Sequence, residues 1–302
     1  MSEVPTRGAG GPLAATEARN PRTRGLDILA TGDLVALLAR EQRDAADSVA
    51  AATPALARAV DAIAARLRDG GTLHYVGAGT SGRLAMLDAA ECPPTFGTPP
   101  GLVVAHVAGG VDALVRAIEG AEDDGAAGAA VMRECVRPGD AVVGISASGG
   151  APYVAAALAA ARLLGALTVG VTSVAASRVA RESEIAIVTE TGAEPLAGST
   201  RLKAGTAQKL VLNTLSTGVM IRLGRVYDNA MVDVVATNAK LRSRALRLVC
   251  EIAGVDEVRA SALLDEAQGS VKIAIAIECC GLDAAGARAR LSAAGGFLRA
   301  LL

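Results

Sequence analysis

A turn rich in glycine and hydroxyl side chains follows the first strongly apolar run of the chain. The run 73–76 leads into Gly79, Thr80 and Ser81, and helix-forming residues continue over 83–91. Glycine lets the backbone turn sharply and lets a ligand approach it closely. The free N–H groups of a helix N-terminus, together with the positive end of the helix dipole, attract anions. The spacing therefore predicts a strand, a tight turn and a helix start that bind a phosphate group.

The same glycines also fit the G-x-G-x-x-G spacing of dinucleotide sites. Such a site requires an acidic residue about 20 positions further on, at the end of the next strand. The next apolar run, 102–108, ends in Gly109 and Gly110, and position 97 is also a glycine. We therefore favour a phosphorylated small molecule over a dinucleotide, with a purely structural turn as the remaining alternative.

A second turn with hydroxyl side chains follows the strand predicted at 141–146. It contains Ser146, Ser148 and Gly149, and a helix is predicted from Pro152. Ligands of open α/β sheets bind just outside the carboxyl ends of the strands, so two such turns on neighbouring strands would converge on one anion. The alternative is that both serines only form the turn and cap the helix. Neither turn is followed by a Walker-type lysine, which argues against nucleotide hydrolysis.

A third segment combines hydroxyl and basic side chains at the start of a long predicted helix, 199–223. Ser199 and Thr200 are followed by Lys203. Hydroxyls cap helix N-termini, and a nearby lysine would add positive charge, so this segment is a possible second anion clamp. An ordinary capped helix with an exposed basic face explains the same residues equally well.

Two glutamates have surroundings that suit acid–base catalysis. Glu91 comes just before Pro93 and Pro94, which are predicted to stop a helix. The negative end of that helix dipole would favour a neutral carboxyl, which can act as a general acid. Glu122 is one of four acids in 119–124, where repulsion between like charges would also favour a neutral carboxyl. From composition alone, both would more often be solvated charges at helix ends.

The histidines and cysteines give no pattern that would hold a metal or a disulfide. His74 and His106 stand inside apolar runs without a third ligand at metal spacing, so we expect them in the core. The five cysteines are odd in number and lack C-x-x-C spacing. We expect reduced thiols and no metal site among these residues.

Composition excludes several classes of function. The chain of 302 residues has a formal net charge of −1 and 2% aromatic residues, which argues against a nucleic-acid partner. Its 51% hydrophobic content is enough to bury a core. The most apolar stretch, 152–176, is interrupted by Arg162 and Gly165, so we expect no membrane span. Residues 1–24 lack the apolar region of a secretory signal, and we expect a cytoplasmic protein.

Apolar runs alternate with helical segments between these motifs. The near-continuous apolar runs predict strands of a buried parallel sheet, at 73–76, 102–108, 141–146, 167–172 and 185–189. The helical patterns cover 33–45, 54–67, 83–91, 111–121, 125–136, 152–164 and 199–223, then 241–253, 255–266, 271–279 and 283–293. This order predicts an α/β fold with a doubly wound, mostly parallel sheet. We divide the chain into an N-terminal segment (1–54), a central α/β domain (55–228) and a small C-terminal helical subdomain (239–302).

Several longer strings resemble one family, the N-acetylmuramic acid 6-phosphate etherases of the sugar isomerase (SIS) fold. The matching strings are TEARNP (16–21), GAGTSGRL (77–84), LDAAECPPTFG (87–97), EGAED (119–123), GSTRLKAGTAQKLVLN (198–213), MVDVVATN (231–238) and GGF (295–297). The resemblance covers nearly the whole chain.

The resemblance implies cleavage of the ether between D-lactate and C3 of the sugar, which yields N-acetylglucosamine 6-phosphate in cell-wall recycling. It also implies a homodimer with shared active sites that uses no metal or cofactor. In that family the glutamates of the ECPP and AED strings are the catalytic pair, and these correspond to Glu91 and Glu122 here. We assign Glu91 as the acid and Glu122 as the base.

One departure from the family pattern concerns the second turn. The family usually reads ASGRTPY where this chain reads ASGGAPY, so Gly150 and Ala151 replace an arginine and a hydroxyl. We expect weaker phosphate binding, with Ser146 as a substitute hydroxyl. A non-catalytic sugar-phosphate regulator of the same fold and a sugar-phosphate isomerase are the alternative functions.

Overall fold

Five short strands form one fully parallel sheet with the order β2-β1-β3-β4-β5. The computed structural model describes residues 15–236 and 238–302, so the first fourteen residues of the predicted N-terminal segment lie outside it. The strands are β1 (Leu73–Gly77), β2 (Val103–Val107), β3 (Ala141–Ile145), β4 (Leu167–Thr172) and β5 (Ile185–Val188). β1 pairs with β2 on one side and β3 on the other, so the chain reverses its direction of winding between β1 and β3. The predicted doubly wound parallel sheet is confirmed.

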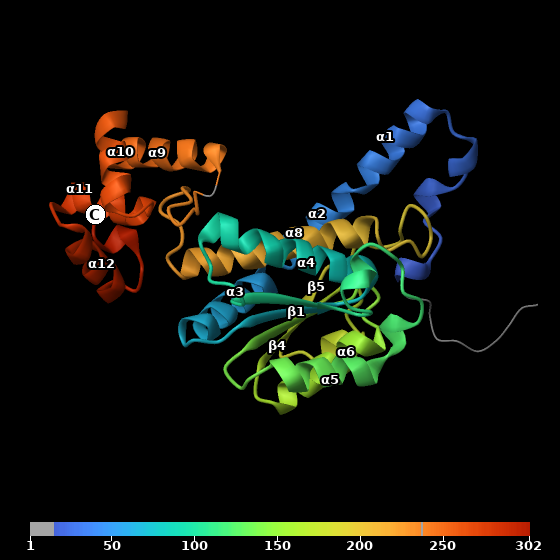
Figure 1. The fold of residues 1–302 in the computed structure, drawn as a ribbon. Helices are drawn as coiled ribbons and strands as arrows, with labels where there is room; N and C mark the ends of the chain where they lie inside the picture. Colours follow the sequence, from blue (N-terminus) through green and yellow to red (C-terminus); the bar gives the residue numbers. More distant parts are fainter. Residues whose placement is uncertain (1–14, 237) are drawn as a thin grey trace, which may run out of the picture.

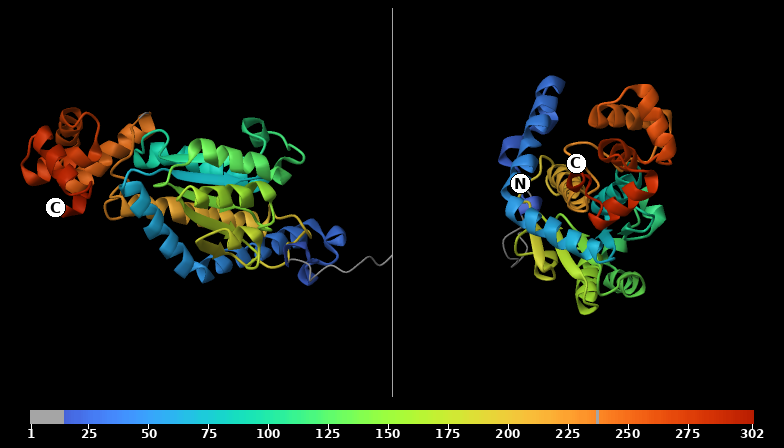
Figure 2. Two further views of the ribbon diagram at one scale, coloured as in Figure 1. Left: turned by 90° about the horizontal axis from the view of Figure 1, so that it is seen from below. Right: turned by 90° about the vertical axis from the view of Figure 1, so that its left-hand side faces the viewer.

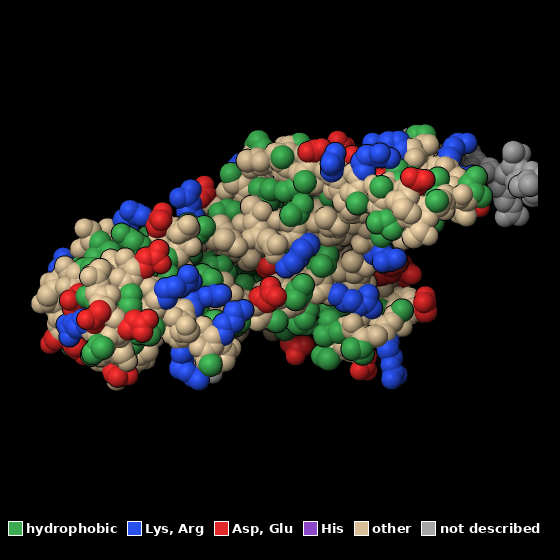
Figure 3. Space-filling view, turned by 90° about the horizontal axis from the view of Figure 1, so that it is seen from above, with side chains coloured by type: hydrophobic (Ala, Val, Ile, Leu, Met, Phe, Trp, Pro, Cys, Tyr) green, Lys and Arg blue, Asp and Glu red, His purple; other side chains and the backbone are tan. Residues whose placement is uncertain are grey.

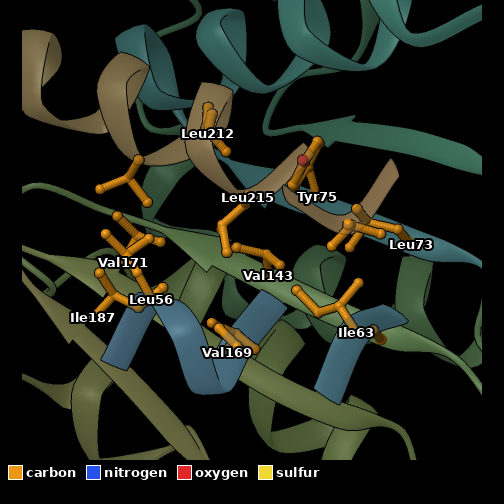
Figure 4. Close-up of a cluster of buried hydrophobic side chains, with 14 of the residues drawn as sticks. Leu56, Ile63, Leu73, Tyr75, Val143, Val169, Val171, Ile187, Leu212 and Leu215 are labelled. Carbon is orange, nitrogen blue, oxygen red and sulfur yellow. The ribbon is translucent and has the colours of Figure 1, made fainter. Parts of the chain in front are cut away.

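Helices cover both faces of this sheet, as Figure 1 shows. One layer consists of α3 (Thr53–Arg68), α4 (Gly79–Phe96) and α8 (Lys203–Arg222). The opposite layer consists of α5 (Gly125–Cys135), α6 (Pro152–Leu163) and the short α7 (Arg178–Arg181). Because strand side chains alternate between faces, Tyr75 and Val143 join the core under α3 and α8, whereas Val76 and Val142 join the core under α6. Figure 4 shows the first of these cores, with Leu56, Ile63 and Leu215 packed against the strands.

The N-terminal helices differ from the sequence expectation in one respect. A single helix was predicted over 33–45, but two helices, α1 (Thr31–Glu41) and α2 (Arg43–Ala51), meet at Gln42.

In the part of the chain that the structure describes, no single helix is long and apolar enough to cross a membrane, although the bent pair 31–51 and 53–68 meets the length and composition test.

The loop between β2 and α5 corrects a second expectation. A helix was predicted over 111–121, but the structure has only two 3-10 turns there, Val111–Leu114 and Ala121–Asp123. Gly120 takes a left-handed backbone with φ +73°. Val111 and Val115 are 77% and 82% exposed whereas Ala113 is buried, so only part of the apolar pattern that suggested a helix faces the core.

The two prolines after Glu91 do not end the helix, contrary to expectation. α4 continues through Pro93 and Pro94 to Phe96. Each proline removes one N–H donor, but Cys92 and Phe96 are buried and hold the last turns in place. The helix ends at Gly97, whose φ of +60° suits glycine and whose N–H donates to the carbonyl of Pro93. Glu91 therefore does not lie at the end of a helix.

Four helices follow the sheet and form a hydrophobic cluster of their own. They are α9 (Ala239–Ala253), α10 (Glu257–Glu266), α11 (Val271–Cys280) and α12 (Ala284–Ala293). Asn238, Asp256, Ser270 and Asp283 each accept a hydrogen bond at a helix start, which explains why these helices begin where they do. Figure 2 shows these helices at the opposite end of the molecule from the N-terminal helices.

Candidate functional site

The turn after β1 is built from glycines with distinct structural roles. Gly79 has a φ of +53°, and a Cβ added there would meet nothing within 4 Å. A Cβ on Gly82 would lie 2.7 Å from a methyl group of Val107, and one on Gly77 would lie 2.7 Å from the Gly82 nitrogen. Glycine is therefore required at 77 and 82 for close packing of strand and helix, and at 79 for the turn, which leaves open space beside the backbone.

The N-terminus of α4 has no side-chain cap among the described residues. Ala78 stands at the N-cap position with an extended backbone, and a methyl group cannot accept a hydrogen bond. The first N–H groups of the helix, those of Gly79, Thr80 and Ser81, have no intrahelical acceptor. They lie at the carboxyl edge of the sheet, at the point between β1 and β3 where the direction of winding reverses. This is the position at which open α/β sheets bind anionic ligands.

The side chains of this first turn contact α8. Ser81 is 7% exposed, and its Oγ donates to Oε1 of Gln208 at 2.9 Å. Thr80 lies beside Gly205, where a Cβ would come within 3.4 Å of the threonine methyl group. Gln208 was not among the predicted site residues. A signal was available, because Gln208 is a polar residue on the apolar face that buries Ala204, Val211 and Leu215.

The turn after β3 uses its hydroxyls to hold its own backbone. Oγ of the buried Ser146 accepts from the N–H of Gly149 at 3.1 Å, and Oγ of Ser148 accepts from the N–H of Gly150 at 3.3 Å. Gly149 has a φ of +66°, and a Cβ there would lie 2.2 Å from Oγ of Ser177. Both serines thus form the turn, as the structural alternative proposed. An accepting hydroxyl still has its own hydrogen, which remains free to bind a ligand oxygen.

The start of α8 already holds an anion, the side chain of Glu194. Its Oε2 accepts from the N–H of Lys203 at 2.8 Å, and its Oε1 accepts from the N–H of Ala204 at 2.9 Å. Glu194 is fully buried, and burial raises its pKa, although the two backbone hydrogen bonds and the charge of Lys203 act in the opposite direction. No sequence signal identified Glu194 as the capping group.

Lys203 is paired with carboxylates of the N-terminal helices. Its ammonium lies 2.8 Å from Asp44 Oδ2 and 3.6 Å from Glu41 Oε2, and the side chain is fully buried. Arg22 pairs with the same two carboxylates. Ser199 and Thr200, predicted with Lys203 as a clamp, are half-buried in the preceding loop. The ammonium of Lys203 is therefore directed to its own protein's carboxylates.

Glu122 lies beside the first turn of α4. It lines a cavity of about 170 Å³ together with Gly79, Arg83 and Ile118. Arg83 donates to the carbonyls of Leu114 at 3.2 Å and Arg116 at 3.1 Å, which holds the intervening loop against α4. The structure thus brings one of the two predicted catalytic carboxyls to the predicted phosphate site.

Glu91 lies elsewhere on the same helix. It is twelve residues beyond Gly79, which places it about 18 Å along α4 at about 1.5 Å per residue. Its side chain is 63% exposed, and Oε2 lies 4.0 Å from Nζ of Lys209 on α8. One turn before it, Asp88 is buried and accepts from Tyr75 at 2.9 Å and Ser216 at 3.0 Å. Burial raises the pKa of Asp88 in spite of these two hydrogen bonds.

The two histidines form a stacked pair on neighbouring strands. Nδ1 of His74 lies 3.0 Å from Nε2 of His106, and Nε2 of His74 lies 3.4 Å from a carboxylate oxygen of Asp140. Burial lowers the pKa of His74 and, together with the charge of His74, lowers that of His106 to about 4. Within residues 15–236 and 238–302, no cluster of three His, Cys, Asp or Glu side chains could hold a metal ion.

Comparison with known proteins identifies the family. The chain is 52% identical to the N-acetylmuramic acid 6-phosphate etherase of Salmonella choleraesuis over 95% of this chain and 97% of that protein. The etherase of Salmonella typhimurium gives the same figures. This chain belongs to the N-acetylmuramic acid 6-phosphate etherase family.

Domain and structural comparisons agree with this family assignment. Residues 55–162 match the glucokinase regulatory protein N-terminal SIS domain, and residues 123–217 match the SIS domain. A phosphoheptose isomerase from Francisella tularensis has a TM-score of 0.52 with 18% identity, covering 63% of this chain and 98% of that chain. At that identity the likeness shows a shared fold only.

Within this etherase-family chain, the structure does not bring the two predicted catalytic glutamates together. Glu122 lines the cavity at Gly79, whereas Glu91 contacts Lys209. The sequence suggested a pair but carried no information on the distance between its members. That distance depends on the packing of the loop that carries Glu122 against the start of α4, twelve residues before Glu91.

Proposed function

We propose that this protein cleaves the lactyl ether of N-acetylmuramic acid 6-phosphate and releases N-acetylglucosamine 6-phosphate and D-lactate. The observation that supports this proposal is the 52% identity with etherases over 95% of the chain. The proposed setting is amino-sugar recycling in the cytoplasm, and the five cysteines, all free thiols, fit a reducing compartment.

The proposed phosphate site lies at the carboxyl ends of β1 and β3. The N–H groups of Gly79, Thr80 and Ser81 would bind the anion from one side, with Ser146, Ser148 and Gly149 on the other. We leave Lys203 out of this site because its ammonium already has carboxylate partners. Ser199 and Thr200 remain proposed contacts to the sugar. The missing arginine and hydroxyl at Gly150 and Ala151 should weaken binding without abolishing it, since the backbone amides remain.

We propose a homodimer in which Glu91 of one subunit and Glu122 of the other act on the same substrate. Glu122 lies beside Gly79, and Glu91 lies about 18 Å further along α4 than Gly79. This distance argues against a pair within one chain. Exposed apolar residues fit a subunit contact: Val111 and Val115 lie in the loop before Glu122, and Leu87 on α4 is 42% exposed. Figure 3 shows hydrophobic side chains among Lys and Arg on the face formed by α4 and α8.

The proposed reaction is an elimination followed by hydration. Opening of the sugar ring exposes an aldehyde at C1, which acidifies the proton on C2. Glu122 first removes this proton to give an enolate, and the C3–O bond then breaks while Glu91 gives a proton to the departing lactyl oxygen. A C2–C3 double bond conjugated with the aldehyde remains, and water adds to it at C3 while C2 regains a proton. This route requires no metal or cofactor.

The order of the two roles needs its own test, because the helix-end argument for Glu91 as the acid does not apply to a helix that continues to Phe96. We expect Glu91→Gln to lose lactate release yet still exchange the C2 hydrogen with deuterated solvent. We expect Glu122→Gln to lose both. The opposite exchange pattern would reverse the roles, and full lactate release by either variant would remove that residue from the mechanism.

Mixing the two inactive variants tests the shared site. In a mixed dimer one site carries both substitutions and the other carries none. Random exchange of subunits should therefore restore about a quarter of wild-type lactate release. A mixture that stays inactive after subunit exchange, verified by mass-tagged subunits, would place both glutamates in one chain and overturn the shared site.

A sugar-phosphate regulator is the second candidate function, favoured by the match of residues 55–162 to the glucokinase regulatory protein domain. Such a protein would bind the sugar phosphate without turning it over. Incubation with N-acetylmuramic acid 6-phosphate followed by a lactate assay decides between the two. Lactate formation supports the etherase, and binding without lactate supports the regulator.

A further inference from the structure

The buried amide of Gln208 is only half satisfied. Its Oε1 accepts the hydrogen bond from Ser81 Oγ at 2.9 Å, but its Nε2 has no partner among the residues that the structure describes, which also bury it from solvent. Gln208 itself is 1% exposed. A buried amide group without a hydrogen-bond partner is costly, so such a group in a folded protein calls for an explanation.

The hydrogen bond also determines what Ser81 can offer a phosphate. A serine hydroxyl has one hydrogen, and here that hydrogen is directed to Gln208. Ser81 could then present only lone pairs to the phosphate oxygens, which is repulsive. Ser146 and Ser148 differ, because each accepts from a backbone N–H and keeps its hydrogen for a ligand.

A half-turn of the Gln208 amide would change this arrangement. The oxygen and nitrogen of the amide have nearly the same shape, so both orientations fit the same space. After the turn, Nε2 would donate to Ser81 Oγ and the hydroxyl hydrogen would be free to bind the phosphate. After the turn, the amide oxygen of Gln208 lacks a partner in place of Nε2. In return, Ser81 gains a hydrogen bond to the charged phosphate.

We propose that Gln208 is a positioning residue for the phosphate, whose amide reverses when the ligand binds and so converts Ser81 into a hydrogen-bond donor. This inference rests on the proposed phosphate site. It adds a residue of α8 that acts through Ser81 and does not itself contact the ligand.

Calorimetric titration of N-acetylglucosamine 6-phosphate into variants tests the proposal. Gln208→Glu has the same size but only accepts at pH 8, so it should hold the Ser81 hydrogen and weaken binding about 10- to 100-fold, the worth of a charge-assisted hydrogen bond. Gln208→Met leaves the Ser81 hydroxyl free to rotate and should lose less than Gln208→Glu. Affinity of Gln208→Glu should recover as the pH falls and the new carboxyl is protonated.

A double-mutant cycle with Ser81→Ala separates this effect from simple charge repulsion. If Gln208 acts through Ser81, the Gln208→Glu substitution should cost much less affinity in the Ser81→Ala background than in the wild type. An equal loss in both backgrounds would mean repulsion alone and would overturn the proposal. A loss in Gln208→Met as large as in Gln208→Glu would also overturn it. Failure of wild-type protein to bind the product or release lactate would instead refute the proposed function.

Discussion

The starts of α4 and α8 carry similar sequence signals but have opposite structural roles. Each helix start carries a glycine with two adjacent hydroxyls, inside the first turn at α4 and just before the helix at α8, and each was expected to bind an anion. At α8 the anion is the protein's own Glu194, which accepts from the first two N–H groups. At α4 the N-cap is Ala78, and no described side chain occupies the equivalent position. A helix N-terminus is thus available to a ligand only where the fold leaves it empty.

The surroundings of the two helix starts extend this difference. Lys203 and its two carboxylates tie the start of α8 to α1 and α2, which makes this region part of the structural framework. The start of α4 lies next to a cavity and an exposed loop that Arg83 holds in place. The filled terminus contributes mainly to stability, and the empty terminus is available for binding.

Removal of the internal anion should give the largest effect. Glu194→Ala leaves two buried N–H groups and the charge of Lys203 with one partner fewer, so we expect a loss of about 3 kcal/mol in the free energy of unfolding. Glu194→Gln keeps one acceptor oxygen and should lose less. Urea denaturation measures both, and an alanine variant with the wild-type midpoint would show that the capping contributes nothing.

Removal of the lysine should have a somewhat smaller effect. Lys203→Met leaves Glu41 and Asp44 without their buried cation, although Arg22 still pairs with both. We expect a loss of about 2 kcal/mol, below the cost of an isolated buried charge because Asp44 contacts solvent. Phosphate-ligand affinity, measured in the same variant by calorimetry, should stay within about twofold of wild type. A tenfold loss of affinity with unchanged stability would return Lys203 to the binding site.

A carboxylate at the N-cap position of α4 should occupy its first N–H groups, as Glu194 does at α8. The backbone of Ala78, with φ −122° and ψ 154°, suits an N-cap residue, so Ala78→Asp should cap α4 and compete with the phosphate. We expect at least about a tenfold loss in affinity for N-acetylglucosamine 6-phosphate with unchanged or higher stability. Ala78→Asn caps without charge and serves as the control, with a smaller loss. Wild-type affinity in the aspartate variant would place the phosphate elsewhere.

The smallest predicted effect concerns pH and the strands beneath α4. Both histidine pKa values are lowered in the folded protein, that of His106 to about 4, so the folded state binds fewer protons than the unfolded chain. Their contribution is complete above the unfolded value near 6.5 and is lost as the pH falls toward 4. We expect a loss of about 1 kcal/mol at pH 5.5, reduced in His106→Phe.

The carboxylates at α8 should respond at lower pH. Burial raises the pKa of Glu41 and Asp44, but hydrogen bonds from Arg22, Asn20 and Lys203, with the nearby positive charges, outweigh it and lower both values. Their contribution is present above the ordinary values near 4 and is lost below them. Denaturation profiles between pH 6.5 and 4.5 should therefore change with substitutions at His106 and not with Lys203→Met. The reverse pattern would contradict this assignment.

The sequence by itself determined the five strands and most of the helices, with their order; the exceptions are the helix predicted over 111–121 and the division of 33–45 into two helices. The strand 167–172 and the helix 152–164 were predicted to within one residue, because continuous apolar runs and helical periodicity are local properties of the chain. The glycines at 77, 79 and 82 marked the turn in the sequence, although only Gly79 is required by its backbone conformation and the other two are required by close packing. The parallel sheet followed from the alternation of these elements.

Only the tertiary structure decided which groups are free and which are paired. Glu194 caps a helix that starts nine residues later, and Gln208 meets a serine 127 positions away. The loop that carries Glu122 packs beside Gly79 at the start of α4, and this placement separates Glu122 from Glu91, which lies twelve residues further along the helix. Such contacts depend on the distances between packed elements, which local propensity does not encode. The first N–H groups of α8 are therefore bound by a side chain of the protein, whereas those of α4 are available to a ligand.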